Sequence, residues 1–295
     1  RKALAGCVIL VVLFDLWSVG KRYLNEENFV EKNDFEAIYS SGEDPYGLGD
    51  SDLHFRVLDI PNFGNAVTSY YYNTIGGYSA VKMQRYQDLI DRYITKEIRD
   101  IYGAMEGAAT VQEVAEALPE TKVVSMLNGR YIILDGNISP VVNKYAYGNC
   151  WFVDSYIPAA TPDEEIALLA HTDLRNTAVI GDDFAWAQDA IRHFEHSSDY
   201  HSEHSSDCHF ELVEKSPTIA LTHYAPNELR YSFSTDTERA AIFSEIYYPK
   251  GWKAWIEPEG AYGEVRNGHY HPSGEGRPVE LFRADWMLRG AMIPS

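Results

Sequence analysis

Cysteine is scarce in this chain of 295 residues, which carries only Cys7, Cys150 and Cys208. Three cysteines cannot all pair within one chain, and Cys7 lies in an apolar stretch near the start. The sequence therefore allows one bridge between Cys150 and Cys208, and it favours three thiols over that bridge.

Positive charge is also in short supply. The chain has 25 Lys and Arg residues against 44 Asp and Glu residues, and its formal net charge is −19. Nucleic-acid phosphates require a basic face, so this balance argues against a nucleic-acid partner. It argues equally against a general electrostatic attachment to anionic lipid.

The common catalytic motifs are missing. The sequence contains no G-x-S-x-G, no H-E-x-x-H, no P-loop and no G-x-G-x-x-G. Its many carboxylates do not group into an acid and base pair. We therefore predict no catalytic residue and no cofactor for this chain.

What is present indicates a folded protein. Apolar residues make up 45% of the chain and aromatic residues 13%, which is typical of globular domains and not of disordered chains. A chain of this length can form one large domain or two ordinary ones.

The start of the chain holds its longest apolar stretch. Ala3–Phe14 is uninterruptedly non-polar, and Asp15 follows it. A membrane-spanning helix needs about 20 apolar residues and at least about 17, so Ala3–Val19 reaches the minimum only with Asp15 included. A signal-peptide core, the last transmembrane helix before an outside domain, and a buried helix all fit this stretch.

The residues that flank the stretch favour the membrane helix. Arg1 and Lys2 precede it and Trp17 lies near its far end, an arrangement typical of a helix that starts in the cytoplasm. Lys21 and Arg22 weaken this orientation argument. The chain begins without methionine, so we expect a fragment or a processed product.

The strongest helical pattern follows an aromatic segment and a glycine pair, Gly76-Gly77. Ser79 is the predicted N-cap, and the helix is expected to continue to about Tyr102. Apolar residues recur at three- and four-residue steps and lie on one helix face. They are Val81, Met83, Tyr86, Leu89, Ile90, Tyr93, Ile94, Ile98 and Ile101.

This segment is the best candidate for a ligand site. Glycines allow close backbone approach, and a helix start offers amides without helical partners, which together can hold an anion. Lys82 and Arg85 add positive charge. The predicted anion or substrate site is therefore Gly76, Gly77, Tyr78, Lys82 and Arg85. The alternative is a plain turn with a positive φ, in which the two cations pair with neighbours such as Asp88.

The remaining patterns predict an α+β fold, with an N-terminal α/β-type domain followed by an antiparallel β-sandwich. Thr110 is a predicted N-cap, and a helix is expected over 161–171 with Pro162 at its first helical position. Residues 123–127 are expected to lead into a buried strand at 130–134. The predicted parts are a membrane-helix remnant (1–22), a linker (23–54), a mixed α/β domain (55–192), a His/Ser-rich insertion (193–215) and a β-sandwich domain (216–295).

Two further clusters are weaker candidates. Histidines in the Ser-rich insertion could bind a metal, although their spacing fits no fixed tetrahedral pattern and a flexible insertion is the favoured interpretation. They are His196, His201, His204 and His209. The aromatic side chains of Tyr247, Trp252 and Trp255 could stack on a sugar ring, but core packing is favoured.

Six blocks, in order, resemble the YfhO family of bacterial integral membrane proteins. The most specific is IGGYSAVKMQRYQDLID, and the blocks span residues 75–91, 124–133, 148–153, 224–231, 243–254 and 282–290. The resemblance implies the extracytoplasmic region of a polytopic membrane protein, of a glycosyltransferase-like kind that uses polyprenyl-phosphate sugars for cell-envelope glycans.

The same resemblance implies the partners. They are the protein's own membrane domain and a lipid-linked sugar or envelope glycan, with the catalytic acids in membrane loops outside this chain. The chain itself is then non-catalytic. A carbohydrate-binding module and a structural cap of the membrane domain are the alternatives.

Overall fold

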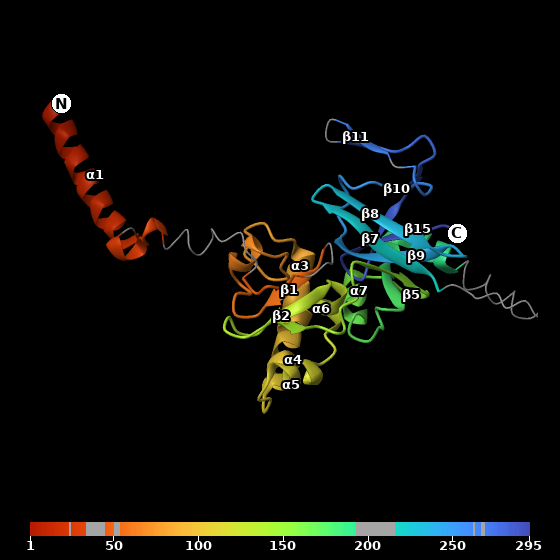
Figure 1. The fold of residues 1–295 in the computed structure, drawn as a ribbon. Coiled ribbons are helices and arrows are strands. Elements are labelled where there is room, and N and C mark those ends of the chain that lie inside the picture. The colour runs from red at the N-terminus through yellow and green to blue at the C-terminus, as the bar shows by residue number, and fades with distance from the viewer. Residues whose placement is uncertain (24, 34–44, 50–53, 193–215, 262, 267–268) are drawn as a thin grey trace, which may run out of the picture. The chain divides into compact units, whose positions relative to one another are not determined.

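The computed structural model describes residues 1–23, 25–33, 45–49, 54–192, 216–261, 263–266 and 269–295 (Figure 1). The chain forms two compact units, Arg1–Gly49 and Asp50–Ser295. The predicted histidine metal site and Cys208 lie outside the described residues.

The first unit is dominated by α1 (Lys2–Tyr23), an unbroken helix with no buried side chain, followed by η1 (Glu26–Asn28). Among the described helices, α1 is the one that is long and apolar enough to cross a membrane. A signal sequence near an N-terminus has the same length and composition.

In the second unit, a three-stranded sheet joins distant segments. Its order is β1 (Arg56–Asp59), β2 (Gly129–Ile133), β3 (Val141–Val142), with β1 and β2 parallel and β3 antiparallel to β2. Side chains of β1 and β2 such as Leu58 and Ile132 are fully buried, as expected of parallel strands.

The central helix of the sequence begins later than predicted. It consists of α3 (Gln84–Leu89), the π-helical turn η3 (Ile90–Ile94) and α4 (Thr95–Met105). The prediction of Ser79 as N-cap is wrong, because its hydroxyl accepts from Val81 N at 3.3 Å in a local turn. Val81 is 90% exposed, so the start of the apolar pattern has no packing surface to hold it in a helix.

Two other helix starts are confirmed. α5 (Val111–Ala117) is capped by Thr110, whose hydroxyl accepts from Glu113 N at 3.2 Å. α7 (Pro162–Leu168) is capped by Thr161, which accepts from Glu164 N at 3.2 Å. Both caps satisfy an amide that the first helical turn leaves unpaired.

The segment 123–127 leads into the predicted buried strand, which is β2, and most of it forms a helix that was not predicted, α6 (Lys122–Met126). Its β-branched residues favour a strand locally, but a distant carboxylate decides the conformation. Glu97 of α4 accepts from Val123 N at 2.8 Å and from Val124 N at 2.9 Å. This non-local cap satisfies two amides at the start of α6.

A four-stranded antiparallel sheet connects the two predicted domains. Its order is β14 (Leu281–Ala284), β15 (Leu288–Ile293), β9 (Arg239–Ile246), β4 (Cys150–Val153). Since β4 comes from the predicted α/β part and pairs with β9, the segments 55–192 and 216–295 share one sheet.

The remaining described strands form two-stranded sheets. β5 (Ser155–Ala159) and β6 (Thr177–Gly181) are parallel, and η4 (Asp182–Phe184) follows β6. The antiparallel pairs are β7 (Thr218–Ala225) with β8 (Glu228–Ser234), β10 (Ala254–Ile256) with β13 (Arg277–Val279), and β11 (Glu264–Arg266) with β12 (His269–His271). The chain thus combines helices with several antiparallel sheets.

Candidate functional site

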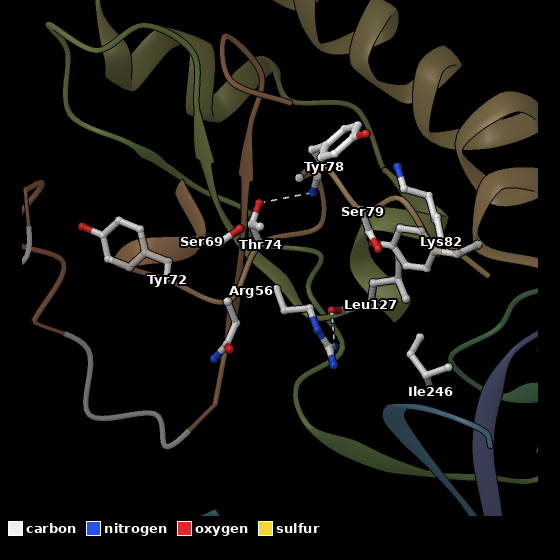
Figure 2. A pocket seen from close by; sticks show the side chains of 13 residues that line it. Arg56, Ser69, Tyr72, Thr74, Tyr78, Ser79, Lys82, Leu127 and Ile246 are labelled. Atoms are coloured by element: carbon white, nitrogen blue, oxygen red, sulfur yellow. Dashed lines mark hydrogen bonds between the residues drawn. The ribbon is translucent and has the colours of Figure 1, made fainter. Parts of the chain in front are cut away.

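A cavity of about 430 Å³ lies beside the glycine pair (Figure 2). It is bordered by the segment before α3, which includes η2 (Val67–Tyr70), together with β1 and the end of α6. Its polar lining residues include Arg56, Ser69, Tyr72, Asn73, Thr74, Tyr78, Ser79, Lys82 and Tyr86. Four of the five residues predicted from the sequence, Gly76, Gly77, Tyr78 and Lys82, border this cavity.

The glycine pair does not present free amides to the cavity. Gly76 N donates to Thr74 Oγ1 at 3.2 Å, and Gly77 N donates to the Phe63 carbonyl at 2.8 Å. Gly77 has φ +100°, and a Cβ on Gly76 would lie 2.5 Å from the Phe63 carbonyl oxygen. Both glycines are therefore required by the turn itself, and α3 begins too late to supply its own amides.

Lys82 supplies the available charge of the cavity. Its side chain is half-buried and forms no ion pair or hydrogen bond with any described residue. A cation in this state can still be approached by an anion at low desolvation cost. The anion-binding role of Lys82 remains a prediction, and the geometry is compatible with it.

Arg56 is the second cation of the lining. It was not predicted as a site residue, because it lies in a short strand about 20 residues before the glycine pair along the chain. Its Nη1 donates to the carbonyls of Leu127 at 2.8 Å and Ser244 at 2.5 Å (Figure 2 shows the first). Its Nη2 lies 3.5 Å from Glu245 Oε1. These bonds fix the guanidinium in one orientation.

Glu245 also faces a buried histidine. His54 Nε2 lies 3.1 Å from Glu245 Oε1, and the His54 ring stacks on Tyr224 with centroids 4.0 Å apart. Burial alone would raise the pKa of Glu245, but the hydrogen bond from His54 and the charge of Arg56 outweigh it and hold the pKa below its usual value. Glu245 therefore stays ionised. It does not border the cavity.

Hydroxyl groups complete the lining. Tyr86 donates to the Ile75 carbonyl at 2.5 Å, and burial raises its pKa to about 12, so the phenol is neutral. Thr74 Oγ1 donates to the Val57 carbonyl at 3.2 Å. Tyr78 is mostly exposed and lies at the rim. The cavity thus offers one cation without a partner among the described residues (Lys82), the already paired Arg56 and several hydroxyls. This set suits an anion bearing hydroxyl groups.

Arg85 lies elsewhere. Its Nη1 is 3.3 Å from Glu165 Oε2 and donates to the Trp286 carbonyl at 2.9 Å, and its guanidinium lies 4.0 Å from the centre of the Trp286 ring. Arg85 follows Lys82 by three residues. Because α3 starts at Gln84, Arg85 lies in the first turn of the helix and reaches the buried Glu165, whereas Lys82 lies before the helix. Arg85 therefore does not border the cavity.

The three aromatic residues proposed for sugar stacking are not gathered into one platform. Tyr247 packs edge-on against Phe184, with centroids 5.4 Å apart. The Trp252 ring is covered by the Arg289 guanidinium at 4.3 Å, and Trp255 packs against Tyr270 at 5.5 Å. Trp252 and Trp255 border a second cavity, whereas Tyr247 does not.

No group of three or more potential metal ligands occurs among the described residues. No family model matches the chain, and no curated protein or solved structure matches it either. The assignment of a ligand class to the first cavity therefore rests on its own chemistry.

Proposed function

We propose that this chain is the extracytoplasmic region of a polytopic bacterial membrane protein and binds the anionic part of a lipid-linked sugar. The parent protein would be glycosyltransferase-like and would use a polyprenyl-phosphate sugar for cell-envelope glycans. The described chain holds the ligand, and the transfer chemistry is supplied by the membrane domain that is its partner.

One observation carries this proposal. The cavity beside Gly76-Gly77 is bordered by Arg56 and Lys82 and by no Asp or Glu. Arg56 already pairs with Glu245, so Lys82 is the cation that remains for a ligand. In a chain with net charge −19, a polar cavity with a lysine unpaired among the described residues and no carboxylate on its lining is a local reversal of sign. Such a place attracts an anion, and phosphate is one of the anions that guanidinium and ammonium groups bind in proteins.

The rest of the lining supports a sugar beside the anion. Hydroxyls and an amide from Ser69, Asn73 and Ser79 can exchange hydrogen bonds with a polyhydroxylated ring. The rim residue Tyr78 adds an exposed aromatic face. These groups favour a sugar phosphate over a bare phosphate.

The membrane setting is supported by α1 and by the resemblance of the six sequence blocks. α1 is long and apolar enough to cross the bilayer. In this proposal the β7–β8 hairpin and the four-stranded sheet are the two layers of the predicted β-sandwich, since Ile219 and Phe233 of the hairpin pack against the cluster that contains Phe243.

Calorimetric titration of the full chain in lipid nanodiscs tests the function. Glucose 1-phosphate, glucose and inorganic phosphate are the probes. We expect glucose 1-phosphate to bind best and Lys82→Met to weaken it by about tenfold, the value of one charge-assisted hydrogen bond. Lys250→Met is the matched control, because Lys250 is an exposed lysine in a turn away from the cavity.

Equal binding by Lys82→Met and the unaltered chain would contradict the proposal. The structural-cap function would then stand, because the glycine pair already has a full explanation in the turn. Preference for glucose over glucose 1-phosphate, unaffected by Lys82→Met, would instead favour a carbohydrate-binding module.

A further inference from the structure

A second, larger cavity of about 860 Å³ lies between the β7–β8 hairpin, the β10–β13 pair and one face of the four-stranded sheet. Its walls are mostly apolar and include Phe233, Phe243, Trp252, Trp255, Val279 and Leu281. Cavities that hold small ligands have volumes of roughly 300–1,000 Å³ and apolar walls with a few placed polar groups. This cavity has the volume and the walls of such a site.

Two carboxylates border the cavity, and both are already paired: Glu228 with Arg230 at 2.6 Å, and Glu257 with the Tyr270 hydroxyl at 2.5 Å. The buried polar group of the cavity is Arg289. Side chains alternate along β15, so Arg289 shares a face with Ala291 and Ile293, and all three border the cavity. Arg289 is only 7% exposed. Its Nη2 donates to the Ile246 carbonyl at 3.2 Å, whereas its Nε has no acceptor among the described residues.

The charge of Arg289 is incompletely compensated. It forms no ion pair with any residue in the described part of the chain. The carboxylate whose charge acts on it is Glu245, which already faces His54 and Arg56. The Trp252 ring beneath the guanidinium, 4.3 Å away, offsets part of the cost. A buried cation with an open donor in an apolar cavity is costly unless an anion joins it.

We propose that this cavity binds a single-chain amphiphile, whose apolar chain lies against the aromatic walls and whose anionic end, a carboxylate or a phosphate, pairs with Arg289. The guanidinium fork matches both anions, and its Nε supplies the open donor. A sugar fits less well, because the ring of Trp252 is already covered by Arg289 and cannot stack on a sugar ring. This inference does not depend on the function proposed for the first cavity.

The experiment uses the full chain in nanodiscs, labelled with 5-fluorotryptophan. The fluorine signals of Trp252 and Trp255 report on this cavity and separate binding there from partition into the bilayer. Decanoate, decyl phosphate and decanol are titrated in parallel. We expect saturable shifts with both anions and at least about tenfold weaker binding of decanol, because the alcohol lacks the charge that Arg289 pairs with.

Variants identify the partner of the anion. Arg289→Met should weaken the two anions by about tenfold or more and leave decanol unchanged, whereas Arg289→Lys should restore the preference for anions. Arg277→Met is the matched control, since Arg277 is exposed on β13 and does not border the cavity. The stronger of the two anions distinguishes a fatty acid from a phosphate-bearing lipid.

Several outcomes would overturn the proposal. They are unmoved fluorine signals, equal binding of decanol and the anions, and shifts caused by maltose instead of the amphiphiles. The comparison of anion with alcohol is made on the unaltered chain, so it remains decisive even if Arg289→Met fails to fold.

Discussion

Arg85 and Trp286 bond to each other in both directions, although 201 residues separate them. Arg85 Nη1 donates to the Trp286 carbonyl at 2.9 Å, and Trp286 Nε1 donates to the Arg85 carbonyl at 2.8 Å. The guanidinium also stacks on the indole and pairs with the buried Glu165. These contacts fasten the first turn of the central helix to the connection between β14 and β15.

The first prediction compares the contributions of Arg85 and Lys82 to the free energy of unfolding. Arg85→Ala should lower the free energy of unfolding by about 2–3 kcal/mol, because it breaks a partly buried ion pair and leaves the Trp286 carbonyl without its donor. Lys82→Ala should change it by less than about 0.5 kcal/mol, since Lys82 bonds to no described residue. Urea unfolding of both variants measures the difference, and equal losses would contradict it.

The second prediction concerns pH and Asp285. This side chain is fully buried, and burial raises its pKa to about 8, although the Val179 amide donates to its Oδ1 at 2.8 Å. The folded chain therefore binds this proton more tightly than the unfolded chain, whose carboxyl titrates near 3.8. The stability from this group is complete below pH 4 and is lost as the pH rises toward 8, at about 1 kcal/mol per pH unit.

Asp285→Asn tests this slope. Asn keeps the oxygen that accepts from Val179 and tolerates the left-handed φ of 49° at this position. Unfolding measured between pH 5 and 8 should show a flatter profile for the variant than for the unaltered chain. Asp236→Asn is the control, because Asp236 is exposed, and it should leave the profile unchanged. An unaltered slope in Asp285→Asn would refute the assignment.

Local chemistry made part of the fold predictable from the sequence. The caps Thr110 and Thr161 each bond to an amide three residues away, so their signal lies within one turn. The pairing of β1 with β2 and of β4 with β9 depends on packing between segments far apart in the chain. No short window contains that information, which is why β4 was assigned to a different part from β9.

The third prediction addresses α6, the helix that the sequence did not indicate. Glu97→Ala removes the acceptor of two buried amides, Val123 N and Val124 N. We expect a loss of about 2–3 kcal/mol in unfolding free energy, the cost of leaving buried donors unsatisfied. Hydrogen exchange at these two amides should accelerate beyond that of the rest of α6.

Glu116→Ala is the control for this change, because Glu116 is exposed on α5 and its carboxylate accepts from the exposed Gln112 side chain instead of from buried amides. Its effect should stay within about 0.5 kcal/mol. If Glu97→Ala is equally mild, α6 holds its conformation without the distant carboxylate, and the explanation of the missed helix is wrong.

The candidate site was predictable only in part, for the same reason. Four of the predicted site residues lie within seven positions of one another in the sequence, and all four border one cavity. They are Gly76, Gly77, Tyr78 and Lys82. Arg56 joins them through the parallel pairing of β1, which brings Leu127 within reach of its guanidinium. Arg85 does not border the cavity with them, because the helix starts at Gln84 and not at Ser79.

The last prediction tests the glycine that shapes the cavity. A Cβ at Gly76 would lie 2.5 Å from the Phe63 carbonyl oxygen and 3.0 Å from Phe63 Cα, both backbone atoms that cannot yield cheaply. Gly76→Ala should therefore cost about 2–3 kcal/mol and displace the turn that carries Tyr78 and Lys82. Gly64→Ala is the matched control, because a Cβ at Gly64 meets nothing within 4 Å and its φ is not positive. Thermal unfolding should separate the two variants, and glucose 1-phosphate binding should fall with Gly76→Ala alone.

If Gly76→Ala unfolds like the control, the turn has more room than the close approach to Phe63 indicates. If it is destabilised and yet binds the sugar phosphate with full affinity, the glycine serves the fold and the ligand lies elsewhere.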